Sequence, residues 1–236
     1  MRSRTVQYRA DGLDLVGTLA VPERPGPHPV VLIGHEGPGL DDIQRARADE
    51  IASLGCIGFA LDYHGALSPF PTRDDMMARL GELFADPDRT RALATAALDV
   101  ALAEPTADAS RVAAIGYCFG ATVALELGRT GADLKAIVGF HPGLTNIRPA
   151  DSANIRARVL MCIGADDPII PIDDRVTFEN EMRAAGVDWQ IHLYGGAMHS
   201  FTHPLASLAG IPGIAYDETA SARSHAAMRA LLAEVF

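Results

Sequence analysis

The chain has 236 residues, of which 48% are hydrophobic, and it carries 20 basic against 30 acidic side chains. No Pro/Ser-rich or charged linker divides it, so this length and composition favour one domain with a large core. The acidic balance argues against nucleic acid or an anionic membrane surface as a partner, and no apolar run is long enough for a transmembrane helix.

After two N-terminal strands, short apolar strands alternate with helical segments along the chain. The predicted strands cover residues 4–9, 13–21, 30–33, 57–61, 111–115, 135–140, 158–163 and 188–194. The predicted helices cover about 43–54, 73–85, 89–103, 119–130, 174–185 and 217–235. Asp11-Gly12 predicts a tight hairpin turn between the first two strands. The alternation predicts a single α/β domain over residues 1–236, with helices on both faces of a mostly parallel sheet of about seven or eight strands.

A glycine-bracketed cysteine, Gly116-Tyr-Cys118-Phe-Gly120, joins the predicted strand 111–115 to the predicted helix 119–130. This is the form of a nucleophile elbow, with cysteine in place of the more common serine. Such a strained turn needs residues without side chains two positions before and after the nucleophile. The free N–H groups of the following helix favour a thiolate over a thiol. The alternative is a buried structural cysteine in front of a glycine-rich helix start.

Three more candidates follow predicted strands, namely Glu36, Asp167 and His199. The order Cys118, Asp167, His199 is the order of nucleophile, acid and histidine in α/β-hydrolases. Ligands of parallel sheets bind beyond the carboxyl ends of the strands, where all four residues are expected. Taken singly, Asp167 could cap a helix, His199 could be a surface histidine and Glu36 a solvated carboxylate. Together they predict an active site in which Asp167 orients His199 and His199 serves as base and then acid.

The sequence resembles the dienelactone hydrolases, or carboxymethylenebutenolidases, a cysteine branch of the α/β-hydrolases. The matching segments are Gly116-Tyr-Cys-Phe-Gly120, Gly164-Ala-Asp-Asp-Pro-Ile-Ile-Pro171, Gly196-Ala-Met-His-Ser-Phe201 and His35-Glu36. The resemblance implies an α/β-hydrolase fold with the hairpin at its N-terminus. It also implies that Glu36 takes the thiol proton of Cys118 when substrate binds. The family's oxyanion hole matches the backbone N–H groups of Phe119 and Gly37.

Substrate recognition is where this chain departs from the family pattern. Family members that act on dienelactone hold its carboxylate with arginines, one of them four positions after the catalytic histidine, where this chain has His203. Arg73 and Arg79 lie in the region of the other arginine. Four histidines are expected at the mouth of the pocket: His35, His64, His141 and His203. The chain shows no metal-ligand spacing, and we expect neither a metal nor another cofactor.

These features predict a hydrolase that acts on an activated ester or lactone through an acyl-cysteine intermediate. One alternative is a general carboxylesterase or thioesterase. Another is a ligand-binding or sensor protein that keeps the fold and the reactive cysteine without turnover. The odd count of three cysteines argues against a disulfide framework and for a reducing cytoplasm. The expected partner is a small ester or lactone, and the expected state is a monomer or small homo-oligomer.

Overall fold

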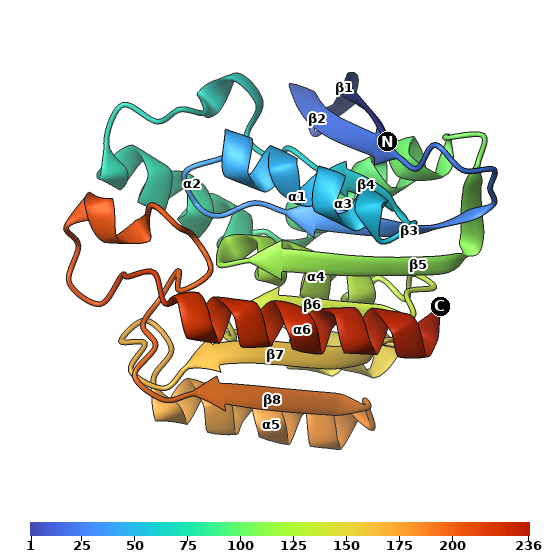
Figure 1. Cartoon of the computed structure of the whole chain (residues 1–236). Coiled ribbons are helices and arrows are strands. Elements are labelled where there is room, and N and C mark those ends of the chain that lie inside the picture. Colours follow the sequence, from blue (N-terminus) through green and yellow to red (C-terminus); the bar gives the residue numbers. More distant parts are fainter.

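The structure, a computed structural model, describes residues 1–236 with the exception of the Leu67 side chain. One eight-stranded sheet runs through the molecule in the order β1-β2-β4-β3-β5-β6-β7-β8 (Figure 1). Its strands are β1 (Arg2–Ala10), β2 (Leu13–Val21), β3 (His28–Gly34), β4 (Ile57–Ala60), β5 (Ala107–Tyr117), β6 (Ala136–Phe140), β7 (Arg158–Gly164) and β8 (Trp189–Tyr194). β2 is antiparallel to both β1 and β4, and all other neighbours are parallel. The predicted α/β fold, with its hairpin and mostly parallel sheet, is confirmed.

Helices cover both faces of this sheet (Figure 1). The helices are α1 (Asp42–Ser53), α2 (Arg73–Ala85), α3 (Pro87–Leu102), α4 (Phe119–Arg129), α5 (Ile172–Ala185) and α6 (Glu218–Val235). Short 3₁₀ turns are η1 (Gly65–Leu67), η2 (Pro149–Asn154) and η3 (Ala206–Ala209). α1 and α6 pack on one face, whereas α3, α4 and α5 pack on the other, and α2 packs beside α3. Each face therefore has its own apolar core.

The N-terminal hairpin forms as the sequence predicts. Asp11 and Gly12 have φ angles of 50° and 73° and join β1 to β2. Two successive left-handed residues give the turn a twist that matches the twist of the strands. β5 differs from the prediction, since it begins at Ala107 rather than at residue 111. Its first residues are polar and largely accessible, so the apolar pattern misses them, but Ala107 pairs with His28 of β3.

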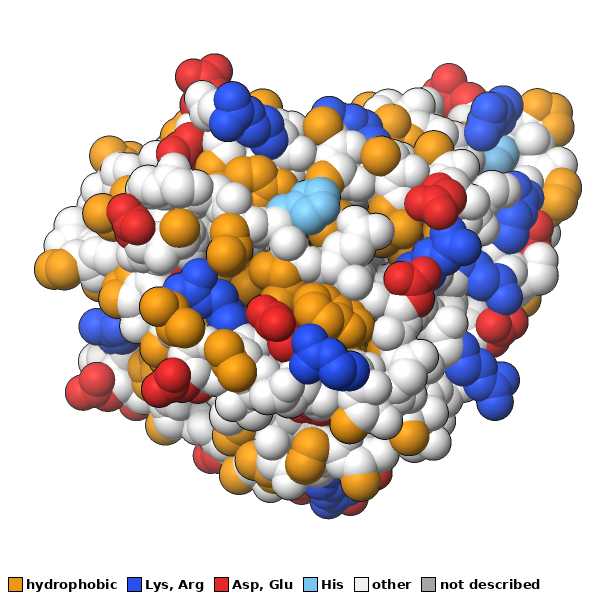
Figure 2. Space-filling model, turned by 90° about the horizontal axis from the view of Figure 1, so that it is seen from below, with side chains coloured by type: hydrophobic (Ala, Val, Ile, Leu, Met, Phe, Trp, Pro, Cys, Tyr) orange, Lys and Arg blue, Asp and Glu red, His pale blue; other side chains and the backbone are white. Residues whose placement is uncertain are grey.

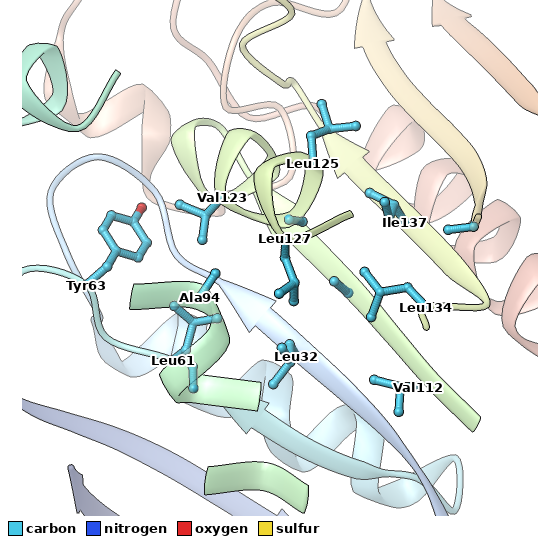
Figure 3. Packing of buried hydrophobic residues seen from close by; sticks show 14 of the residues in the cluster. Leu32, Leu61, Tyr63, Ala94, Val112, Val123, Leu125, Leu127, Leu134 and Ile137 are labelled. Carbon is cyan, nitrogen blue, oxygen red and sulfur yellow. The ribbon is translucent and has the colours of Figure 1, made fainter. Parts of the chain in front are cut away.

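The larger core lies between the sheet and the layer of α3 and α4 (Figure 3). Leu32 of β3 and Val112 of β5 supply strand side chains, while Ala94 of α3 and Val123 and Leu127 of α4 supply helix side chains. All five are almost completely buried. Burial of each large aliphatic side chain contributes about 1.5–3 kcal/mol. This packing fixes α4 on the sheet and with it the turn that joins β5 to α4.

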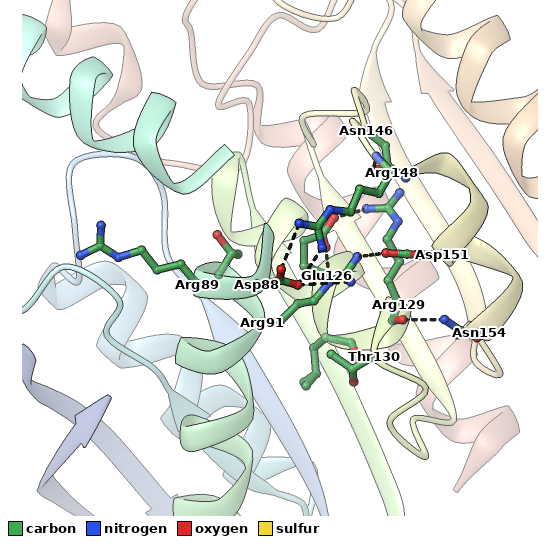
Figure 4. Close-up of polar contacts among 12 residues, drawn as sticks. Asp88, Arg89, Arg91, Glu126, Arg129, Thr130, Asn146, Arg148, Asp151 and Asn154 are labelled. Atoms are coloured by element: carbon green, nitrogen blue, oxygen red, sulfur yellow. Dashed lines mark hydrogen bonds and ion pairs between the residues drawn. The ribbon is translucent and has the colours of Figure 1, made fainter. Parts of the chain in front are cut away.

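A network of buried charges also holds the α3–α4–α5 layer together (Figure 4). Arg91 of α3 pairs with Glu126 of α4 at 2.7 Å and with Asp151 of η2 at the same distance. Arg129 of α4 pairs with Glu126 at 2.8 Å and with Glu181 of α5 at 2.9 Å, and only 1% of its side chain is exposed. Each of these charges has an oppositely charged partner, and we call the set the charge network. Loss of one member would leave another charge buried and unpaired.

The edge of the sheet formed by β8, together with α5, carries a mixed surface. Leu193 of β8 and Ile172 and Val176 of α5 are exposed there. Seen from below, apolar side chains lie among basic and acidic ones, so that neither sign of charge dominates this face (Figure 2). Among the helices that the structure describes, none combines the length and apolar character needed to span a bilayer.

Candidate active site

Cys118 lies on the turn between β5 and α4, where it caps the helix with φ 52° and ψ −119°. A left-handed φ at a residue other than glycine stores about 1–3 kcal/mol of strain. A Cβ atom at Gly116 would lie 2.1 Å from the backbone of Gly120, and one at Gly120 would lie 2.3 Å from the Gly34 carbonyl oxygen. These glycines let the start of α4 approach the ends of β3 and β5. The strand, strained turn and helix expected of a nucleophile elbow are therefore present.

His199 and Asp167 meet beside this turn. His199 Nδ1 donates a hydrogen bond of 2.8 Å to Asp167 Oδ2, and Asp167 Oδ1 accepts a second bond from the Ile169 N–H. Both side chains are buried. Because Nδ1 carries the proton, Nε2 is the ring atom left for proton exchange, and it has no hydrogen-bond partner among the described residues.

Electrostatics at His199 favour its charged form. Burial lowers its pKa, but the interaction with the Cys118 side chain and the hydrogen bond to Asp167 outweigh burial and raise the pKa to about 10. The imidazolium is therefore the form of His199 that this environment favours.

Glu36 follows β3 and lies against the loop that carries His199. Its side chain is 12% exposed, Oε2 accepts a 3.1 Å hydrogen bond from Ser200 Oγ, and Oε1 lies 3.6 Å from His141 Nε2. Burial raises the pKa of this carboxyl, against the opposing effect of His203 and His199. Oε1 makes no hydrogen bond, and none joins Glu36 to Cys118 among the side chains that the structure describes.

His141 lies beside His199. Its ring is fully buried, packs edge-on against His199 with 5.1 Å between centroids, and is hydrogen bonded through Nε2 to Thr202 Oγ1 at 2.8 Å. Burial holds the pKa of His141 well below its usual range, so the ring is neutral. Long-range packing therefore places this ring in the core beside His199 and away from the surface, and a contact with substrate stays a prediction.

His35 and His64 are also buried, which corrects their expected position at the pocket mouth. His35 stacks on Tyr63 with 3.7 Å between ring centroids, and His64 packs edge-on against the same ring at 4.6 Å. Burial lowers the pKa of His35 to about 4 and that of His64 to about 3. Both imidazoles therefore serve as neutral core rings.

The remaining pocket candidates are engaged by other side chains. His203 is partly exposed and donates from Nε2 to Asp41 Oδ2 at 3.0 Å, a bond that raises the pKa of the imidazole. Arg79, the candidate in the region of the family's other arginine, is only 4% exposed, donates to the Tyr63 carbonyl at 3.1 Å and pairs with Glu82. Arg73 begins α2 on the surface. In the described part of the chain, no three or more His, Cys, Asp or Glu side chains are grouped to hold a metal ion.

Three neighbours of the site escaped the sequence reasoning: Ser200, Thr202 and Tyr63. Ser200 and Thr202 hold Glu36 and His141, which are distant in sequence, so no local pattern identifies them. Tyr63 carries a usable signal, because it follows the buried strand β4 at the same edge of the sheet as Glu36 and Cys118.

A model of the dienelactone hydrolase family matches residues 15–236. The chain belongs to this family. It is 26% identical over 202 residues to protein usf of Aquifex pyrophilus, covering 83% of this chain and 85% of that protein. The structure of m3DLH is 44% identical and superposes with a TM-score of 0.96, covering 100% of this chain and 98% of that one. A protein described as a dienelactone hydrolase-like promiscuous phosphotriesterase from metagenomic libraries is 42% identical with the same coverage and a TM-score of 0.95.

Membership of the dienelactone hydrolase family confirms the resemblance noted in the sequence and the α/β-hydrolase fold that it implies. This is a family of hydrolases, and a small ester or lactone fits its members as substrate.

Proposed function

We propose that this dienelactone hydrolase family member hydrolyses an activated ester or lactone through an acyl-cysteine at Cys118. The observation that carries this function is the strained elbow beside the His199–Asp167 pair. The Cys118 thiolate attacks the carbonyl carbon, and the imidazolium of His199 gives its proton to the leaving oxygen as the C–O bond breaks. A water then attacks the acyl group while His199 takes its proton, and the thiolate leaves.

Two free backbone N–H groups support an oxyanion hole formed by Phe119 and Gly37. Phe119 is the first residue of α4, and the partial positive charge at that helix end favours an anion. Neither N–H donates a hydrogen bond to any residue that the structure describes. Preorganised donors of this kind stabilise the tetrahedral oxyanion without reorganisation.

We assign to Glu36 the task of receiving the thiol proton when substrate binds. A buried carboxyl with a raised pKa and an unpaired Oε1 readily accepts a proton. The carboxylate form is destabilised by its surroundings, and protonation relieves that cost. This exchange leaves Cys118 as the thiolate that His199 stabilises.

Uncharged substrates suit the site better than carboxylate-bearing lactones. A buried substrate carboxylate needs a cationic partner. His203 Nε2 is already hydrogen bonded to Asp41. Arg79 is held by Tyr63 and Glu82. A second candidate reaction is phosphotriester hydrolysis at the same cysteine, favoured by 42% identity to the protein described as a promiscuous phosphotriesterase.

A substrate panel with a nucleophile variant tests this function. Lactones, aryl esters, acyl thioesters and an aryl phosphotriester are assayed with the wild type and with Cys118→Ala, while mass spectrometry follows acylation of Cys118. We expect Cys118→Ala to lower kcat by ~10⁴–10⁶-fold with the fold intact. A loss below about tenfold contradicts the acyl-cysteine mechanism. Absence of any burst or turnover by the wild type supports the sensor alternative.

A further inference from the structure

Three consecutive carbonyl groups in the loop after β3 accept hydrogen bonds from one buried aromatic cluster. Tyr63 Oη donates to the His35 carbonyl at 2.6 Å. His35 Nδ1 donates to the Glu36 carbonyl at 2.6 Å, and His64 Nε2 donates to the Gly37 carbonyl at 3.0 Å. All three side chains are fully buried. We call Tyr63, His35 and His64 the carbonyl clamp.

The clamp fixes N–H groups as well as carbonyls. In a trans peptide the carbonyl of one residue and the N–H of the next lie in one plane and point in opposite directions. The bond from His35 to the Glu36 carbonyl therefore sets the direction of the Gly37 N–H. The bonds from Tyr63 and His64 hold the peptide planes before and after it, so loss of either lets the plane between Glu36 and Gly37 turn. The Gly39 N–H donates to the same Glu36 carbonyl at 3.1 Å and holds the peptide plane from a second side. The Gly37 N–H points away from both donors and remains free.

The clamp is itself held rigidly. His35 stacks on Tyr63, His64 packs against Tyr63 and against Phe70, and Arg79 of α2 donates to the Tyr63 carbonyl. Figure 3 shows Tyr63 at the carboxyl end of β3, beside the loop that leaves this strand. The Tyr63 ring also lies 5.9 Å from that of Phe119, whose N–H is the other proposed oxyanion donor.

The histidines of the clamp have defined protonation states. A carbonyl oxygen can only accept, so the proton lies on Nδ1 of His35 and on Nε2 of His64. The opposite ring nitrogens, His35 Nε2 and His64 Nδ1, have no partner among the described residues. Each imidazole is thus a neutral donor with one N–H, and its single bond goes to the loop.

We propose that Tyr63, His35 and His64 are positioning residues that aim the Gly37 N–H at the oxyanion of the acyl-cysteine reaction. They act through the backbone of residues 35–37 and do not touch substrate. This inference rests on the proposed function, because it gives the Gly37 N–H a transition state to stabilise. It also explains the two histidines after β3 and β4 that the triad leaves unused.

The test removes one donor and then restores it. His64→Leu deletes the bond to the Gly37 carbonyl, whereas His64→Gln can place an amide N–H near the position of Nε2. Removal of an oxyanion donor typically costs ~10²–10³-fold in kcat, so misalignment by His64→Leu is expected to cost about 10- to 100-fold. KM should stay within about threefold, because the oxyanion forms only in the transition state. His64→Gln should recover most of the loss.

A second readout separates positioning from general damage to the site. Alkylation of Cys118 by iodoacetamide forms no oxyanion, so its rate in His64→Leu should stay within about twofold of the wild-type rate. The matched control is His28→Leu. His28 is a buried histidine at the opposite end of β3 that is bonded through Nε2 to the Arg24 carbonyl at 3.0 Å. This control should keep full turnover in its folded fraction.

If His64→Leu does not fold, the near-isosteric Tyr63→Phe tests the clamp instead. It removes the bond to the His35 carbonyl, and we expect kcat to fall about three- to tenfold. The clamp is overturned if folded His64→Leu or Tyr63→Phe keeps wild-type kcat, or if alkylation slows in parallel with turnover. Turnover that survives Cys118→Ala overturns the acyl-cysteine function itself. If the clamp variants keep full activity while Cys118→Ala is inactive, only the clamp proposal is wrong and the acyl-cysteine function stands.

Discussion

Helix α4 carries a buried polar cluster at each end, and the two clusters are built in opposite ways. At its C-terminal end the charge network pairs Glu126 and Arg129 with charged groups from α3 and α5. At its N-terminal end Cys118, His199 and Glu36 share a site in which Glu36 Oε1 and His199 Nε2 are buried without hydrogen-bond partners. Unpaired buried polar atoms each cost about 1–3 kcal/mol. In the charge network Arg91 Nη2 is also buried without a regular hydrogen bond, but it lies 2.7 Å from the oppositely charged Asp151.

Backbone strain also differs between the two clusters. Four residues other than glycine have left-handed φ angles, and one of them, Asp11, belongs to the hairpin turn. The other three are Cys118, His141 and Ser200, which surround the proposed active site. No residue of the charge network is strained in this way. The comparison teaches that backbone strain, more than burial or charge, distinguishes the proposed reactive site from a cluster that holds helices together.

The largest effect is expected from the reactive cluster. His199→Ala should lower kcat by at least ~10⁴-fold, because His199 alone is assigned to protonate the leaving oxygen and to deprotonate the attacking water. The double variant with Cys118→Ala should be little worse than either single variant, since the two residues act as a unit. Steady-state kinetics on the best substrate of the panel measure both. Effects that multiply in the double variant would mean that the residues act independently.

Substitutions in the charge network should lower the unfolding free energy without changing kcat. Arg129→Met leaves Glu126 and Glu181 without their shared partner, which should cost about 3–5 kcal/mol of unfolding free energy. Denaturant unfolding measures this loss, and kcat per folded molecule should be unchanged. The matched control is Arg148→Met, whose side chain is 41% exposed and pairs with the exposed Asp88, so its loss should stay below about 1 kcal/mol. A large drop in kcat for folded Arg129→Met would break the comparison.

Glu36→Gln should increase stability at alkaline pH. Burial raises the pKa of Glu36 in the folded protein, so the unfolded chain ionises first as the pH rises, and ionisation of this group then disfavours folding. Below about pH 4 the carboxyl is protonated in both states and the advantage of the amide disappears. Thermal melting of both proteins from pH 4 to pH 9 measures the difference.

The same variant should change the pH dependence of Cys118 alkylation and reduce turnover less than Cys118→Ala does. An unchanged alkylation profile would remove Glu36 from the control of the thiol. Equal stability of the two proteins at every pH would show that the carboxyl is not held in an unfavourable charged state.

The smallest effect is expected at the partly exposed His203. His203→Arg places a permanent cation where His203 now donates to Asp41, and a guanidinium can bind a carboxylate with two parallel hydrogen bonds. We expect kcat/KM for a carboxylate-bearing lactone to rise several-fold relative to an uncharged aryl ester. The ratio of the two specificity constants measures the shift. Efficient hydrolysis of dienelactone by the wild type, at ~10⁴ M⁻¹s⁻¹ or above, would show that another group already binds the carboxylate.

Local patterns in the sequence were enough to place the elements and the elbow. Apolar runs predicted the inner strands, and the hairpin signal predicted the first two. β5 was predicted too short because its first residues, Ala107 to Ser110, form no apolar run. Asp11-Gly12 predicted the hairpin turn, and Gly116 and Gly120 predicted the close approach of α4 to the sheet. These features depend on residues within a few positions of one another or on steric rules at a single position, which a sequence displays directly.

Only the tertiary structure decided what the histidines do. His141 bonds to Thr202, 61 positions away, and Ser200 bonds to Glu36, 164 positions away. His35 and His64 could as well have lined a pocket as filled a core, since the same imidazole serves as ligand, base or buried donor according to its burial and its partner. Which of these roles each ring takes depends on where distant strands end against one another, and that geometry exists only once the sheet has assembled.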